Sequence, residues 1–124
     1  MDKYHITLVD ESEKEMSGDS IVWEVGFKQN GMLIEEKHCF DAIDTTRDWV
    51  YVIDYKDITG ITTAERSNEK EFKSIDYWMG EGDYAVLLHT SGDDGIIGFL
   101  YWSEEERNGQ KAYIEKAIRE KTED

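Results

Sequence analysis

The chain has 124 residues, with 29 Asp or Glu against 14 Lys or Arg, so its formal net charge at pH 7 is −15. This length favours one domain with a hydrophobic core, which we assign to residues 1–124, with residues 20–121 as its core. Such a negative field disfavours direct binding to nucleic acid and to anionic membranes.

The sequence shows no feature that would send the chain to a membrane or a secretory route. No apolar run approaches the roughly 20 residues that span a bilayer, and residues 1–5 lack the basic-then-apolar pattern of a signal peptide. A cytoplasmic location is therefore expected. Cys39 is the only cysteine, which excludes an internal disulfide and a cysteine-rich metal site.

The first third of the chain predicts a strand and a β-hairpin. Residues 4–9 alternate between apolar and polar side chains. Residues 20–28 alternate as well, and one face of that strand carries Ile21, Trp23, Val25 and Phe27. Asn30-Gly31 is a strong two-residue turn signal, so residues 20–37 are predicted to form a hairpin with Trp23 in the core.

The middle third is less regular. Residues 38–48 fit either an irregular excursion or a short helical turn. Residues 49–55 predict a strand, and after a break at Lys56 the chain continues extended through residue 63. We expect the polar segment 64–71 to be a hairpin connection and residues 72–78 to form the next strand.

Residues 84–121 carry the most consistent local signals. Two runs, 84–90 and 96–102, are apolar on both pleat faces, which favours central strands joined by the turn 91–95. Gly98 inside the second run indicates a bulge or a close approach of backbone from another element.

A helix is predicted from Glu104 to about Lys121. Ser103 is a good N-cap, and Glu106 stands three residues later, as in a capping box. A narrow apolar stripe, which packs one side of the helix against the sheet, is formed by Tyr113, Ile114, Ala117 and Ile118. Trp102 is expected to act as a hydrophobic staple at the start of this helix.

Together these elements predict a mainly β fold with a C-terminal α-helix. Six to eight short strands would form a small antiparallel barrel or sandwich, and the helix would cap it.

Residues 52–61 carry a resemblance to a known family. A strand is followed by an aromatic residue, a spacer, an acid and Ile, and then by another strand. This pattern, with the final hairpin and helix, resembles prokaryotic pleckstrin-homology-like domains, including GRAM-like ones. The resemblance implies a binding scaffold in which Asp57 turns the chain and Ile58 packs under the barrel. Some members bind phosphoinositides through basic early loops, but the acidic loop 10–19 disfavours anionic lipid here.

The sequence contains no pattern that is typical of an enzyme or a metal site. His5, His38 and His89 lack metal-ligand spacing, and Asp93-Asp94 fits a turn better than a calcium loop. No phosphate-binding loop, nucleophile elbow or zinc pattern occurs. We therefore expect no catalytic residue, no metal and no cofactor.

The pair Trp78-Met79 precedes a Gly-flanked turn, and aromatic residues and Met are enriched at binding cores, so the pair is a candidate anchor for a protein partner. The alternative is that Trp78 folds over an open end of the barrel. Acids from loops 10–19 and 64–71 would complete the partner surface, namely Glu11, Glu13, Glu15, Glu65, Glu69 and Glu71.

Two functions remain open from the sequence. The first is a non-enzymatic protein–protein interaction domain whose acidic surface meets a protein partner, and a basic partner would suit that charge. The second is an acidic inhibitor of the kind that viruses encode, which would imitate nucleic acid and block a basic nucleic-acid-binding protein.

Overall fold

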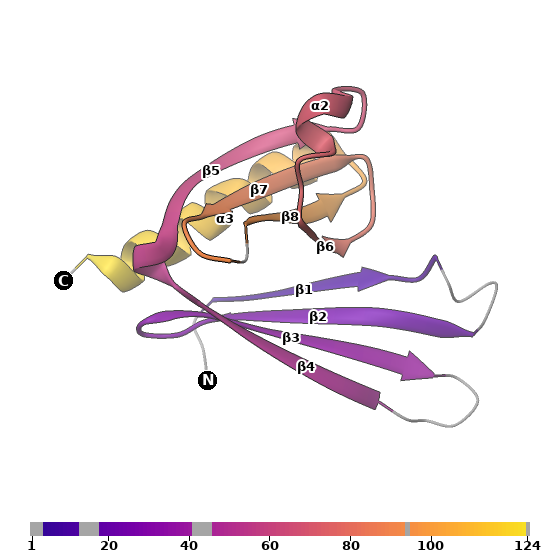
Figure 1. Cartoon of the computed structure of the whole chain (residues 1–124), viewed down its shortest axis with the longest axis horizontal. Coiled ribbons are helices and arrows are strands. Elements are labelled where there is room, and N and C mark those ends of the chain that lie inside the picture. The colour runs from indigo at the N-terminus through magenta and orange to yellow at the C-terminus, as the bar shows by residue number, and fades with distance from the viewer. Residues whose placement is uncertain (1–3, 13–17, 41–45, 94, 124) are drawn as a thin grey trace.

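The chain forms two β-sheets that face each other and a C-terminal helix (Figure 1). The computed structural model describes residues 4–12, 18–40, 46–93 and 95–123, with the backbone alone at 40 and 46–48. The strands are β1 His5–Asp10, β2 Asp19–Phe27, β3 Gly31–Phe40, β4 Thr46–Asp54, β5 Ile58–Glu65, β6 Tyr77–Gly80, β7 Tyr84–Thr90 and β8 Ile96–Tyr101. The helices are η1 Tyr55–Asp57, α2 Glu69–Phe72 and α3 Glu104–Thr122.

The first sheet is an antiparallel meander in the order β1-β2-β3-β4. The predicted hairpin forms between β2 and β3, but its turn is centred on Gln29-Asn30, one residue before the Asn30-Gly31 pair: Phe27 pairs with Met32, and the Lys28 N–H donates to the Gly31 carbonyl oxygen at 2.9 Å. A side chain at Gly31 would overlap the backbone of Ile53 on β4, so this close approach of strands requires glycine.

The second sheet has the order β5-β7-β8-β6. Its two central strands are β7 and β8, which confirms the prediction from their two apolar faces. β6 pairs with β8 in parallel, so the expectation of a purely antiparallel fold is wrong at this strand. The reason is the preceding connection: β6 follows a crossover that contains α2, and a hairpin would have produced an antiparallel pair.

The two sheets form a sandwich, and the alternative of a closed barrel is not observed. The chain passes from the first sheet to the second through η1, where Asp57 lies in the bend and Ile58 opens β5. Ile58 packs partly buried against the core between the sheets.

The main core lies between the sheets. Trp23, Val25 and Phe27 on β2 are buried in it, as the alternation of the sequence predicts. A second, smaller apolar cluster lies where the connection from β5 to β6 covers the second sheet, and it contains Phe72, Ile75 and Leu87.

The helix α3 packs against the core through the predicted stripe. Ile114 and Ala117 are buried, and Tyr113 and Ile118 are partly buried against the same cluster. Ser103 caps the helix, since its hydroxyl oxygen accepts from the backbone N–H of Glu106 at 3.1 Å. In Figure 1 the helix lies alongside the second sheet.

Several boundaries differ from those expected. β3 extends to Phe40 and β4 begins at Thr46, so both described ends of the segment 38–48 are strand, and residues 41–45 lie outside the described part. Phe72 ends α2, and the expected strand 72–78 shortens to β6. Trp102 is 63% exposed and does not serve as a buried staple. No helix in the described ranges has the length and apolarity to cross a bilayer.

Candidate functional site

The surface around Trp78 is built from β6 and α2. The Trp78 side chain is 38% exposed, and its ring lies 4.8 Å from the ring of Phe72, measured between centroids. The guanidinium of Arg66 lies over the Phe72 ring, 4.6 Å from its centroid. The Trp78 ring therefore packs against Phe72, with the two ring planes inclined by 54°, and still faces solvent. The alternative that Trp78 covers an open barrel end does not apply to a sandwich, and its role as a partner anchor stays a prediction.

The acidic residues predicted for the partner surface do not all lie next to Trp78. Glu69 and Glu71 are exposed on α2, the helix that ends with Phe72, and Glu65 is half-buried at the end of β5. Glu11 lies beside Glu81, just after β6, where its backbone N–H donates to a carboxylate oxygen of Glu81 at 3.3 Å. Glu13 and Glu15 lie outside the described residues.

Met79, the other predicted anchor, is fully buried in the core between the sheets. The correction follows from strand alternation: neighbours on β6 point to opposite faces, so Trp78 and Met79 cannot both face solvent. Met79 therefore lies outside the candidate surface, which is left with Trp78 and the exposed acids of α2.

A cavity of about 240 Å³ lies between the two sheets. The residues that line the cavity come from the strands β3, β4, β6 and β8, from the position before β6 and from the turn that follows β7. The apolar part consists of Ile34, Ile53 and Ile97, the aromatic part of Tyr51 and Tyr77, and the carboxylates are Asp76 and Asp93. The two tyrosine rings contact each other, with centroids 5.1 Å apart and planes inclined by 57°.

A polar network beside the cavity joins the sheets. The Tyr77 hydroxyl on β6 donates to Oε1 of Glu36 on β3 at 2.9 Å, and the Trp23 indole N–H donates to the same oxygen at 3.0 Å. His38 Nε2 lies 3.4 Å from the second oxygen of Glu36. Burial raises the pKa of Tyr77 well above its ordinary value. The Tyr77 hydroxyl therefore stays protonated and serves as a hydrogen-bond donor.

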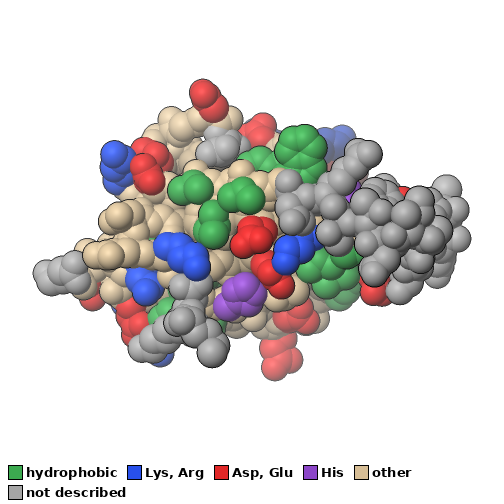
Figure 2. All heavy atoms as spheres, turned by 90° about the horizontal axis from the view of Figure 1, so that it is seen from below, with side chains coloured by type: hydrophobic (Ala, Val, Ile, Leu, Met, Phe, Trp, Pro, Cys, Tyr) green, Lys and Arg blue, Asp and Glu red, His purple; other side chains and the backbone are tan. Residues whose placement is uncertain are grey.

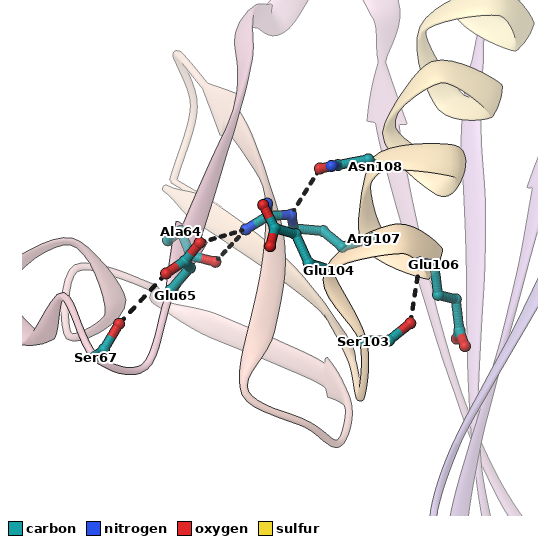
Figure 3. Close-up of polar contacts among 8 residues, drawn as sticks. All are labelled: Ala64, Glu65, Ser67, Ser103, Glu104, Glu106, Arg107 and Asn108. Carbon is teal, nitrogen blue, oxygen red and sulfur yellow. Dashed lines mark hydrogen bonds and ion pairs between the residues drawn. The ribbon is translucent and has the colours of Figure 1, made fainter.

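Arg107 on α3 is 5% exposed and was not singled out by sequence reasoning. As Figure 3 shows, its guanidinium points toward β5, where it donates to the carbonyl oxygen of Ala64 at 3.2 Å. It also lies 3.7 Å from a carboxylate oxygen of Glu65 and 3.6 Å from one of Glu104. These contacts fix the helix to the second sheet, so the role of Arg107 is structural.

The outer face of the first sheet carries no single charge type. Figure 2 shows hydrophobic groups among Lys or Arg, Asp or Glu, and a His on this face. Val50 and Val52 on β4 are exposed there, and Lys37 pairs with Glu24 at 3.1 Å. Trp49, also on β4, is exposed.

The remaining chemical candidates stay apart. His89 contacts the hydroxyl of Thr62 at 2.8 Å, and His5 is exposed on β1. Within the ranges that the structure describes, no three His, Cys, Asp or Glu side chains gather as a metal site would require. No protein family, curated protein or solved structure matches the chain.

Proposed function

We propose that the chain is a non-enzymatic, cytoplasmic protein-binding domain whose Trp78 surface docks on a basic partner protein. The observation that carries this proposal is the exposed Trp78 ring, which packs against the inclined ring of Phe72 at the end of α2, the helix that carries the exposed acids. A rigid aromatic ring at the surface is the type of side chain that most often dominates binding energy.

The charge of the chain supports a basic partner. The net charge of −15 would attract positive surfaces over distances set by ionic strength. Glu69 and Glu71 stand next to the aromatic anchor, so they would form a charged rim around an apolar centre.

A pleckstrin-homology-like scaffold is part of the same proposal. Two four-stranded sheets followed by a C-terminal helix support it. The acidic character of Glu11 and its neighbours argues against the anionic-lipid binding of some members of that family.

The test begins with affinity capture from the cells that make the protein and purification of the partner. The dissociation constant is then measured by calorimetry for the unaltered chain and for Trp78→Ala. We expect a loss of about 2 kcal/mol, which corresponds to roughly 30-fold weaker binding. The matched control is Trp102→Ala, because Trp102 is more exposed and belongs to neither β6 nor α2, the two elements that build the proposed surface.

The result that contradicts the proposal is an unchanged dissociation constant for Trp78→Ala when its fold is intact. An equal loss in Trp78→Ala and Trp102→Ala would also contradict it, because the effect would then be general to exposed tryptophans.

A second candidate, the acidic inhibitor that imitates nucleic acid, is favoured by the net charge alone. The mixed outer face of the first sheet does not favour it, because Lys37 interrupts the acids there. Competition separates the two: a nucleic-acid mimic would be displaced from its partner by DNA or RNA, whereas the proposed domain would keep its complex at the same ionic strength.

A further inference from the structure

The cavity between the sheets has the composition of a site for an organic cation. An apolar base of Ile34, Ile53 and Ile97 would accept an aliphatic chain. The rings of Tyr51 and Tyr77 line the same space, and aromatic faces attract cations within about 6 Å. Its volume of about 240 Å³ lies below the roughly 300 Å³ at which typical small-molecule sites begin. A single side chain is therefore a better match than a larger ligand.

The carboxylates at this cavity come from two acidic residues. Asp76 and Asp93 both line it, and both are exposed. Among the described residues, neither carboxylate forms an ion pair. The backbone N–H of Ile96 donates to Oδ2 of Asp76 at 2.9 Å and fixes its position. A side chain at Gly95 would overlap that carboxylate, so glycine is needed for this arrangement.

The aromatic wall is also fixed before any ligand arrives. Tyr77 is oriented by its hydrogen bond to Glu36, which also accepts from Trp23. Tyr51 contacts the Tyr77 ring at an inclination of 57°, so the two rings form a corner. A compact ammonium group fits a corner, whereas a planar guanidinium prefers to stack on one flat face. Preorganised walls reduce the entropy lost on binding.

We propose that this cavity binds the side chain of a lysine from a partner protein, with the aliphatic stem against the isoleucines and the ammonium group between the tyrosines and Asp76 and Asp93. That the lysine comes from a partner protein rests on the proposed protein-binding function. The preference of the cavity for an ammonium group does not depend on that function, so it is tested with small molecules.

The test is a titration of the whole chain with Nα-acetyl-lysine methylamide, followed through the methyl NMR signals of isoleucine residues. We expect saturable shifts for Ile34, Ile53 and Ile97. The neutral norleucine analogue, which keeps the stem without the charge, is expected to cause no saturable shift. Equal binding of the norleucine analogue, or tighter binding of the arginine analogue, would overturn the assignment of an ammonium site.

Two sets of variants locate the site. Asp76→Asn with Asp93→Asn should weaken the lysine analogue at least about fivefold. Glu105→Gln with Glu123→Gln removes the same charge from α3 and its C-cap and should leave affinity unchanged. Tyr51→Phe keeps the ring and should keep binding, whereas Tyr51→Leu should lose it, provided that both retain the native spectrum.

Equal weakening by the two charge-removing pairs would overturn the proposed site, because only the overall field would then matter. The outcome is separate from that of the Trp78 experiment. If the amine does not bind, the cavity assignment fails and the Trp78 proposal is unaffected. If Trp78→Ala keeps full partner affinity, the Trp78 proposal fails and the cavity assignment is unaffected.

Discussion

The buried guanidinium of Arg107 on α3 donates to the backbone carbonyl oxygen of Ala64 on β5, across 3.2 Å. The two residues are 43 positions apart, so this bond joins the last helix to the edge strand of the second sheet. The two carboxylates near Arg107 are more open to solvent, with the Glu65 side chain 44% exposed and that of Glu104 61% exposed, which leaves the contact with Ala64 as the least replaceable one.

Replacing this guanidinium should destabilise the fold. We expect Arg107→Met to lower the free energy of unfolding by about 1–3 kcal/mol, because the Ala64 carbonyl loses its donor while the side-chain stem is kept. Urea denaturation measures the change. Arg119→Met, on an exposed position of the same helix, should stay within about 0.5 kcal/mol of the unaltered chain. Equal effects of the two substitutions would show that Arg107 has no special role.

Removing the hydroxyl of Tyr77 and removing that of Tyr101 should have different effects on stability. Tyr77→Phe deletes the donor to Glu36 and should cost about 1 kcal/mol of unfolding free energy. Tyr101→Phe should be neutral or stabilising, because the buried Tyr101 hydroxyl has no hydrogen-bond partner in the described part of the chain. Thermal or urea denaturation of the two variants checks the order, and a larger loss for Tyr101→Phe would contradict it.

Stability should fall at alkaline pH. Burial raises the pKa of Tyr77 and of Tyr101 above the ordinary tyrosine value, and the charge of Glu106 adds to the effect at Tyr101. Below about pH 10 both groups are protonated in the folded and unfolded chains. Above it the unfolded chain ionises first, so the unfolding free energy decreases as pH rises.

The contribution of these two residues to that decrease is measurable by urea denaturation between about pH 8 and pH 11. In the double variant Tyr77→Phe with Tyr101→Phe the decrease should be smaller, because phenylalanine cannot ionise. A decrease of the same slope in the double variant would assign the effect to other groups.

The close contact between Gly98 and Ile75 should make Gly98→Ala costly. A Cβ at Gly98 would lie 2.8 Å from Cδ1 of Ile75. Position 98 is therefore glycine because a side chain from another element approaches it closely, and not because backbone does. We expect a loss of about 1–3 kcal/mol by chemical denaturation. The control Gly60→Ala should be near neutral, since nothing lies within 4 Å of that position.

A second step tests the cause of the Gly98→Ala loss. Ile75→Ala removes the clashing atoms, so the double variant should lose less than the sum of the two single variants. Strict additivity would show that the clash is not the cause.

Much of the fold could be predicted from local patterns. The Asn-Gly signal indicates one hairpin, whose turn lies within one residue of it, and Ser103 with the stripe containing Ile114 specifies the last helix. The two central strands were visible because both faces of β7 and β8 are apolar. These signals are local, so sequence carries them directly.

The parts that escaped prediction depend on distant contacts. The parallel pairing of β6 follows from a crossover, and α2 has one turn, too short for a periodic signal. The cavity joins Tyr51 to Tyr77 from different sheets, and no spacing rule connects them. Arg107 offered one faint signal, the i,i+3 pair with Glu104, but its burial depends on β5.

Amide hydrogen exchange of the complex with the captured partner tests the central claim most directly. Docking on the Trp78 surface should slow exchange in residues 66–80, which include α2 and β6, and leave the exposed side of α3 unchanged. Slowed exchange confined to α3 or to the outer face of the first sheet, with none in residues 66–80, would contradict the account.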